Sequence, residues 1–103
     1  MSARKEIPSK YQIFQTSDYG QFVVYPQFHR PTPARELRRL ERKILANNQL
    51  ANWPIWVTEK MEVVDGTRRL RVATKHGLAI YYVFKYTSAA YHKWIKEKYG
   101  DEI

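Results

Sequence analysis

The sequence predicts one α+β domain, with a mixed sheet, about three helices and a hairpin near the N-terminus. Its 103 residues suit a single compact domain. Hydrophobic residues make up 44% of the chain and aromatic residues 15%, which favours a folded core over disorder. Short runs of aromatic and β-branched residues alternate with segments of helical periodicity. We therefore place the domain at residues 11–103, after a flexible basic arm of residues 1–10.

The first elements expected are two strands, at residues 11–15 and 21–25. Both are rich in aromatic and β-branched residues, and the turn-rich stretch 16–20 separates them. The two strands are therefore expected to pair as a hairpin. Pro26 ends the second strand, and an irregular connection follows.

A first helix is expected to begin at Pro33, with Thr32 as its N-cap, and to end at Asn47-Asn48. Its apolar residues recur at helical spacing and define an inward face: Leu37, Leu40, Ile44 and Leu45. Its basic residues fall in an arc of roughly 140° on the opposite side. These residues are Arg35, Arg38, Arg39, Arg42 and Lys43.

Two short strands are expected next, at residues 53–57 and 61–64, with a turn at 58–60 between them. Asp65-Gly66 then makes a tight turn, because aspartate followed by glycine is typical of such positions. A second helix begins directly after this turn. The order strand, glycine, helix is therefore predicted at this point of the chain.

The second helix begins at Thr67 or Arg68 and runs to about His76, where Gly77 is well placed to stop it. Residues 78–84 are almost entirely apolar or aromatic and predict a buried strand.

A last helix is expected from Ser88, its N-cap, to Gly100. Its spacing predicts that Tyr91, Trp94 and Ile95 face inward.

The charge balance favours a polyanionic partner. Lys and Arg number 18 and Asp and Glu number 10, a net charge of +8. Nucleic acid, a nucleotide or a negative protein surface fits this imbalance, and a solvated basic surface without a dedicated partner is the alternative. The absence of cysteine excludes disulfides and cysteine-based zinc sites and favours a cytoplasmic protein. No apolar run approaches the roughly 20 residues of a membrane span, so we expect no membrane partner.

The turn at residues 65–69 has the composition of a phosphate site. The first turn of a helix presents unpaired N–H groups and partial positive charge, and glycine lets an anion approach the backbone. Thr67 adds a hydroxyl, and Arg68 and Arg69 add fork-shaped cationic donors. Alternatively, this is an ordinary helix N-terminus whose arginines pair with acidic neighbours (Glu59 and Glu62) or with solvent. Asp65 is expected to cap the turn rather than to hold a nucleotide-bound metal.

Residues 61–78 resemble the signature of the ParB/sulfiredoxin superfamily. In partition proteins the signature is Gly-Glu-Arg-Arg, then an apolar residue, Arg and Ala, with Gly-Leu a few residues on. In small ParB-like proteins of phages and mobile elements it is Asp-Gly-Gln-His-Arg. This chain combines the Asp-Gly of the second form with the Arg-Arg of the first. Upstream, residues 53–57 and Arg30 match the family's strand and arm, so the resemblance covers roughly residues 20–85.

The resemblance implies a ParB/sulfiredoxin-like fold and a bound nucleotide or nucleic-acid phosphate. The implied contacts are Gly66, Thr67, Arg68 and Arg69, with Arg30 closing over the ligand. The superfamily includes CTP-binding DNA clamps, ATP-using sulfinic-acid reductases, a free-serine kinase and proposed nucleases, so the fold does not choose the activity. The family histidine is Arg68 here, a permanent cation, and Phe28-His29 replaces the small residues of the family arm. Both changes favour binding without strong catalysis.

Other chemistry has little support in the sequence. The three histidines lack metal-ligand spacing, so no metal site is predicted, and no carboxylate pair or Ser-His-Asp arrangement indicates a catalytic residue. Five aromatic residues are expected mainly to pack, with base stacking as the alternative. These are Trp53, Trp56, Tyr81, Tyr82 and Tyr86.

The leading hypothesis is a phage or mobile-element ParB-like protein that binds nucleic acid or nucleotide phosphates in a bacterial cytoplasm. The predicted phosphate-binding residues are Arg30, Asp65, Gly66, Thr67, Arg68 and Arg69. The predicted nucleic-acid-binding residues are Arg35, Arg38, Arg39, Arg42, Lys43 and Arg71. One alternative is a counter-defence inhibitor that binds a host protein–nucleic-acid effector, such as an RNA-guided nuclease or its guide RNA. The other is a ParB-like nuclease, nucleotide hydrolase or kinase.

Overall fold

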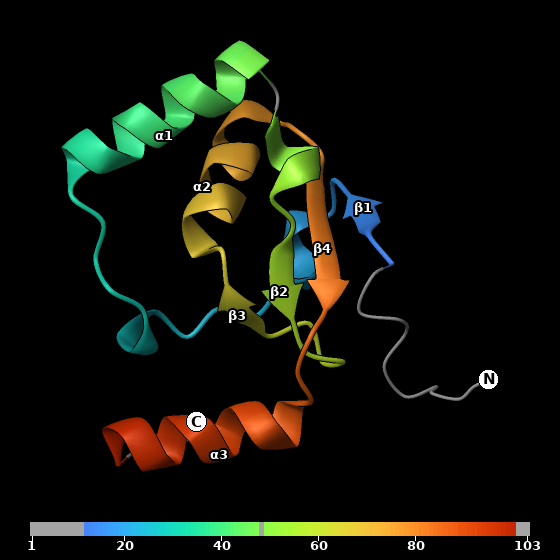
Figure 1. The fold of residues 1–103 in the computed structure, drawn as a ribbon, viewed down its shortest axis with the longest axis vertical. Helices are drawn as coiled ribbons and strands as arrows, with labels where there is room; N and C mark the ends of the chain where they lie inside the picture. The colour runs from blue at the N-terminus through green and yellow to red at the C-terminus, as the bar shows by residue number, and fades with distance from the viewer. Residues whose placement is uncertain (1–11, 48, 101–103) are drawn as a thin grey trace.

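A four-stranded mixed sheet and three α-helices make up the part of the chain that the computed structural model describes, residues 12–47 and 49–100 (Figure 1). The regular elements are β1 (Phe14–Thr16), α1 (Ala34–Asn47), β2 (Ile55–Val57), β3 (Val63–Asp65), α2 (Thr67–His76), β4 (Ile80–Phe84) and α3 (Ser88–Tyr99). Three short 3-10 turns complete them: η1 (Tyr19–Gln21), η2 (Pro26–Phe28) and η3 (Gln49–Asn52). The predicted α+β class is confirmed. The predicted arm at residues 1–10 lies outside the described residues.

The sheet order is β1-β4-β2-β3. The inner strands β2 and β4 run parallel, and each edge strand is antiparallel to its neighbour. The connection from β2 to β4 includes β3 and α2, so α2 serves as the crossover helix that a parallel pair requires. α2 therefore starts where edge strand β3 ends.

The hairpin predicted from residues 11–15 and 21–25 is wrong. β1 instead pairs with β4, where Phe14 is opposite Tyr82 and their rings stack with centroids 5.5 Å apart. Residues 21–25 form no strand, and Val23 makes one isolated bridge to Glu62. Aromatic and β-branched composition indicates strand pairing without naming the partner, and here the aromatic partners of Phe14 lie far along the chain.

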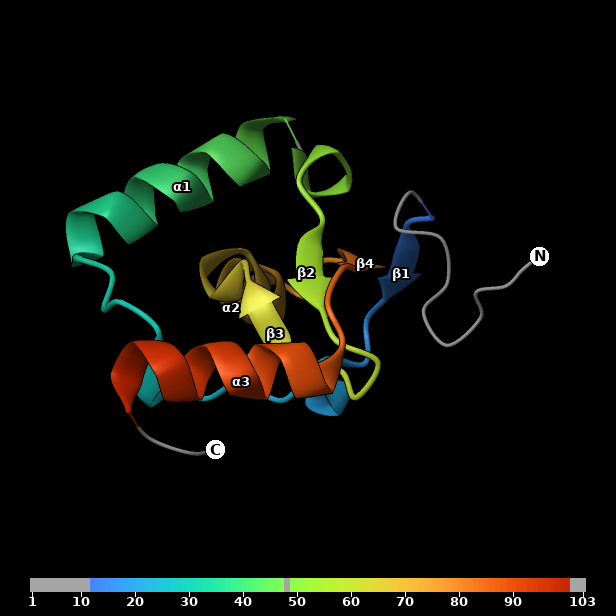
Figure 2. The same cartoon turned by 60° about the horizontal axis from the view of Figure 1, so that its bottom comes forward.

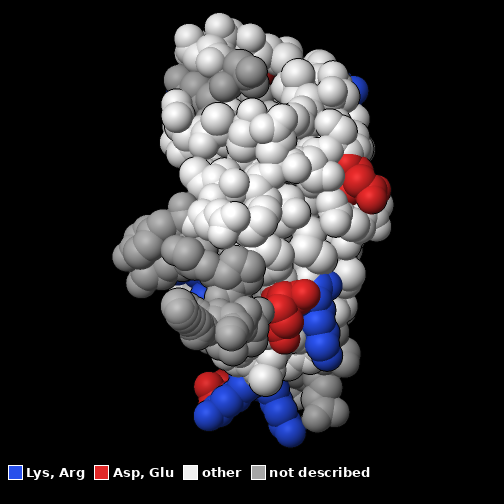
Figure 3. All heavy atoms as spheres, turned by 90° about the vertical axis from the view of Figure 1, so that its right-hand side faces the viewer, with Lys and Arg blue, Asp and Glu red and all other residues white. Residues whose placement is uncertain are grey.

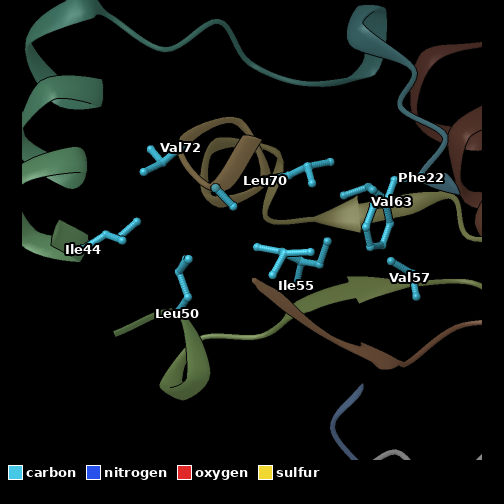
Figure 4. Packing of buried hydrophobic residues seen from close by; sticks show 10 residues of the cluster. Phe22, Ile44, Leu50, Ile55, Val57, Val63, Leu70 and Val72 are labelled. Atoms are coloured by element: carbon cyan, nitrogen blue, oxygen red, sulfur yellow. The ribbon is translucent and has the colours of Figure 1, made fainter. Parts of the chain in front are cut away.

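The main core fills the space between the sheet and the helices α1 and α2. In Figure 4, Ile55 and Val57 of β2 and Leu70 of α2 point into it, as does Ile44 of α1. Ile44 is completely buried, whereas the neighbouring Leu45 is 49% exposed, so the predicted inward face of α1 is too wide. Neighbouring residues on a helix point about 100° apart, which explains why only one of them reaches the core.

A second, smaller core holds α3 in place. Tyr91 and Ile95 are buried, one turn apart, and pack with Phe28 of η2. Trp94, which was also predicted to face inward, is 45% exposed, so that prediction is wrong. Its ring stacks on the outer side of Tyr91, with centroids 6.3 Å apart. The contact surface of α3 is therefore one narrow stripe, and Trp94 lies beside it.

The helices begin and end close to the predicted residues. α2 begins at Thr67 and ends at His76, and Gly77 has the left-handed conformation that was expected of a C-cap. The N-cap of α3 is Thr87 rather than Ser88: its Oγ1 accepts from the Ala90 N–H at 3.1 Å. Ser88 is the first helical residue, and its N–H donates to the Glu59 carboxylate at 2.7 Å.

α1 also begins one residue later than predicted, at Ala34 instead of Pro33. The carbonyl of Pro33 accepts the Leu37 N–H at 3.0 Å, so Pro33 directly precedes the first helical residue. The helix was predicted to end at Asn47-Asn48. Asn47 is its last described residue, and residue 48 lies outside the described residues. In the described ranges, no helix combines the length and the apolar character needed to cross a bilayer.

Candidate phosphate-binding site

The turn between β3 and α2 is held tightly against β2. Gly66 has a φ of 106°, a left-handed conformation that side chains rarely adopt. A Cβ at this position would lie 2.5 Å from Cγ2 of Ile55. Glycine is therefore required both for the backbone conformation and for the close approach to β2, and together these fix where α2 starts.

The first turn of α2 has no side-chain cap. Gly66 occupies the N-cap position and has no side chain to cap the helix, and among the described residues no side chain accepts a hydrogen bond from the first N–H groups. The predicted capping by Asp65 is therefore wrong. Its carboxylate instead pairs with Arg69, one turn along the helix, at 3.5 Å. The N–H groups and the positive end of the helix dipole are left for another acceptor.

An open cavity of about 590 Å³ lies over this uncapped turn. It brings together the segment that contains Arg30, α1, the segment before β2, and the β3–α2 turn. Its lining residues are His29, Arg30, Leu40, Trp53, Asp65, Gly66, Thr67, Arg68 and Arg69. All six residues predicted to bind phosphate thus line one cavity.

A second cavity, of about 490 Å³, shares four lining residues with the first. These are His29, Arg30, Thr67 and Arg68. It extends along α2 to Arg71, which the sequence assigned to nucleic-acid binding. The two cavities therefore meet beside the start of α2 and together present four arginines.

Arg68 and Arg69, equivalent in the sequence prediction, have different environments. The Nη1 of Arg69 donates to the carbonyl oxygens of Trp53, at 2.8 Å, and Pro54, at 3.1 Å. The guanidinium therefore ties α2 to the segment before β2. Arg68 makes one long ion pair, 3.9 Å from Glu36, in which both side chains are about half exposed. Such an ion pair contributes little to the stability of the fold. Arg68 is therefore the arginine that can turn from Glu36 to bind an incoming anion.

The two acidic residues named in the alternative prediction, Glu59 and Glu62, are committed elsewhere. Glu59 accepts the Ser88 N–H, and Glu62 is buried, where it accepts hydrogen bonds from Thr58 at 2.9 Å and Tyr25 at 2.8 Å. Neither lines the cavity. The alternative in which Glu59 or Glu62 neutralises the first turn of α2 is therefore wrong.

His29 is a cavity residue that the sequence prediction left out of the site. Burial lowers its pKa, although the charge of Asp65 and the backbone of Val63 act in the opposite direction. Its Nε2 is buried and has no hydrogen-bond partner among the described residues. Burial therefore favours the uncharged form of the ring, and one ring nitrogen has no partner in the described part of the chain. Its position next to Arg30 was the available signal in the sequence.

The five basic residues predicted on the outer face of α1 are all exposed. Within the described ranges, none of its four arginines has a carboxylate within 4.0 Å. Glu41, on the same helix, is turned toward the end of α2, where it pairs with Lys75 at 2.9 Å and with His76. α1 contributes Leu40 to the cavity wall, and its arginines lie outside the cavity.

The charge is unevenly distributed over the surface. Figure 3 shows the side of the molecule that carries β1, and most of the described atoms on it belong to uncharged residues.

The described residues include no group of three histidines, aspartates or glutamates placed to hold a metal ion. The electrostatic character of the site therefore comes from its arginines and from the start of α2.

The five aromatic residues divide between the main core and the molecular surface, and Tyr86 alone among them is exposed. Tyr81 and Tyr82 pack against the main core, as expected. Trp53 lines the first cavity, with Lys43 Nζ 5.7 Å from its ring centroid. Trp56 and Tyr86 lie together on a different surface, with ring centroids 6.1 Å apart.

No protein-family model, curated protein or solved structure matches this chain. The resemblance to the ParB/sulfiredoxin superfamily therefore stays a prediction from the motif at residues 61–78.

Proposed function

We propose that this chain binds nucleic acid or nucleotide phosphates at the start of α2, without strong catalysis. The observation that carries the proposal is that the uncapped first turn of α2 opens into a cavity also lined by Arg30 and Arg68. Free N–H groups, the helix dipole and guanidinium donors together make a strong attraction for phosphate oxygens. The motif resemblance supports the same ligand class and a ParB/sulfiredoxin-type fold of phage or mobile-element origin.

The exposed arginines of α1 extend this attraction beyond one phosphate. A row of unpaired cations suits a long polyanion better than a small ligand, since each cation can neutralise a further backbone phosphate. This favours nucleic acid over a free nucleotide. Arg71, at the second cavity, adds one more contact along α2.

Direct binding measurements test this proposal. Labelled DNA, RNA and nucleotides are titrated at two salt concentrations, with wild type, Arg68→Ala and, as a control, Lys60→Ala. Lys60 is an exposed cation in the β2–β3 turn, outside both cavities. We expect affinity that falls with salt, weakens in Arg68→Ala and is nearly unchanged in Lys60→Ala. Absence of binding, or binding independent of salt, would overturn the proposal.

Affinity capture from a bacterial lysate separates this function from inhibition of a host effector. We expect the wild-type chain to recover nucleic acid, and nuclease treatment to abolish the recovery. A single protein partner that survives nuclease treatment would instead favour the counter-defence hypothesis.

A second candidate, hydrolysis or transfer of a phosphoryl group, is favoured by the neutral and unpartnered imidazole of His29. A neutral imidazole in a phosphate cavity has the chemistry of a general base. This candidate predicts turnover of nucleotide or nucleic acid with Mg²⁺ or Mn²⁺ that is lost in His29→Asn. Wild-type protein without turnover would remove it.

A further inference from the structure

A third cavity, of about 430 Å³, lies between α3 and the β2–β3 edge of the sheet. Its walls are mainly aromatic: Trp56, Tyr86, Tyr91 and Trp94, with Val64 beside them. Tyr86 is 42% exposed and Trp94 45% exposed. We call this surface the aromatic groove. It includes residues of α3, which the family resemblance does not cover.

Two lysines lie over the rings of the aromatic groove. Lys85 Nζ is 4.7 Å from the centroid of Trp56, and Lys98 Nζ is 4.8 Å from that of Trp94. A lysine has a long flexible stem, so its ammonium can move from a ring to a phosphate beside it. Exposed aromatic rings accompanied by cations have the composition of surfaces that stack the bases of a single strand.

The aromatic groove and the first cavity share one lining residue. Asp65, the last residue of β3, lines both. Figures 1 and 2 show the end of β3 and the start of α2 lying between α1 and α3. The Asp65 carboxylate is paired with Arg69, which reduces its repulsion of a phosphate at this junction. A strand with one phosphate at the start of α2 can therefore extend its next bases toward α3.

We propose that the aromatic groove stacks the bases of a single-stranded nucleic acid whose backbone is held at the start of α2. This inference rests on the proposed function and names its substrate class. A duplex is a poor ligand for the groove, because its bases are already stacked within the helix. The lysines at the groove and the adjoining arginines favour a polyanion over an apolar protein partner.

The experiment compares a thymidine oligonucleotide with a duplex of equal length. The variants are Trp94→Ala, Trp94→Phe, Arg68→Ala and, as a control, Ile13→Ala. Ile13 is an exposed apolar residue outside the groove. We expect the wild type to prefer the single strand. We expect Trp94→Ala to weaken single-strand binding by about 5- to 150-fold, the range for one lost base–aromatic stack, with the salt dependence preserved. Trp94→Phe retains a ring and should recover most of the affinity.

Fluorescence provides a second readout, since a base stacked on Trp94 quenches its emission. The quenching by the oligonucleotide should be reduced in Trp94→Phe even though binding persists. Circular dichroism and thermal unfolding establish that each variant is folded.

The outcomes separate the two proposals. If Trp94→Ala binds the single strand as the wild type does, the inference about the groove is overturned and phosphate binding at α2 stands. If Trp94→Ala weakens binding while Arg68→Ala has no effect, base stacking in the groove stands, but the placement of the backbone at the start of α2 is overturned together with the proposed function. If neither nucleic acid binds the wild type, both are overturned.

Discussion

The backbone of Gly66 lies so close to Ile55 that a Cβ on residue 66 would be 2.5 Å from the Ile55 Cγ2. This relationship positions the whole candidate site. It sets the start of α2 against β2, beside the segment whose carbonyl groups receive Arg69. The site is therefore built on the sheet rather than on a free loop.

Gly66→Ala should lower the free energy of unfolding by about 2–5 kcal/mol, the sum of overpacking against Ile55 and a left-handed backbone. Gly77 is a matched control. It is also left-handed, with φ 66°, but an added Cβ meets no atom within 4 Å. Gly77→Ala should cost about 1–2 kcal/mol, for the backbone alone. Urea denaturation measures both, and equal losses would contradict the packing argument.

The two arginines of α2 should differ when they are replaced. Arg69→Ala removes the donors to Trp53 and Pro54, so it should lower the free energy of unfolding by about 1–3 kcal/mol. Arg68→Ala should change the free energy of unfolding by no more than about 0.5 kcal/mol, because its one ion pair is long and exposed. It should nevertheless weaken phosphate binding. Denaturation and binding titrations on the same variants decide whether the roles are divided in this way.

Replacing an arginine of α1 should change the salt dependence of nucleic-acid binding. In a plot of log affinity against log salt concentration, loss of one phosphate contact reduces the slope by about 0.7–0.9. We expect this reduction for Arg38→Gln. Lys60→Gln removes the same charge from the β2–β3 turn and should leave the slope unchanged. Equal changes of slope in the two variants would mean that binding depends on the net charge of the protein and not on the position of each cation.

Glu62 should make stability depend on acid pH. Burial alone would raise its pKa, but hydrogen bonds from Ser88, His92, Tyr25 and Thr58 outweigh burial and lower the pKa from 4.5 to about 2. Below pH 4.5 the unfolded chain binds a proton that the folded chain does not. The stability from Glu62 is therefore complete above that pH and is lost as the pH falls toward about 2.

Unfolding curves measured across this pH range test the role of Glu62. The decline should be shallower in Glu62→Gln, which has no carboxylate to protonate. In Tyr25→Phe one hydrogen bond to Glu62 is absent, so the pKa of Glu62 in the folded chain is higher. The decline should therefore be smaller in total and should end at a higher pH. A wild-type curve parallel to that of Glu62→Gln would contradict this prediction.

Local chemistry made the elements around the site predictable. The order of strand, Asp65-Gly66 and helix followed from turn residues and helical periodicity, and so did the stop at Gly77. These features depend on neighbours a few residues away, which the sequence displays directly. The expectation that Arg30 and the turn at residues 65–69 lie together came from the motif resemblance, and one cavity does contain them.

Only the tertiary structure decided which contacts each side chain makes. Composition predicted β structure at Phe14 but could not identify β4 as its partner. Helical spacing could not show that Arg69 would bind carbonyl groups while Arg68 stayed available, or that Trp94 would point outward. The turn at residues 65–66, the helix after it and the positive charge could be predicted from the amino-acid sequence, because they arise from short-range preferences and composition. The tertiary structure decided the division of roles at the site, because burial and hydrogen-bond partners arise when distant segments pack together.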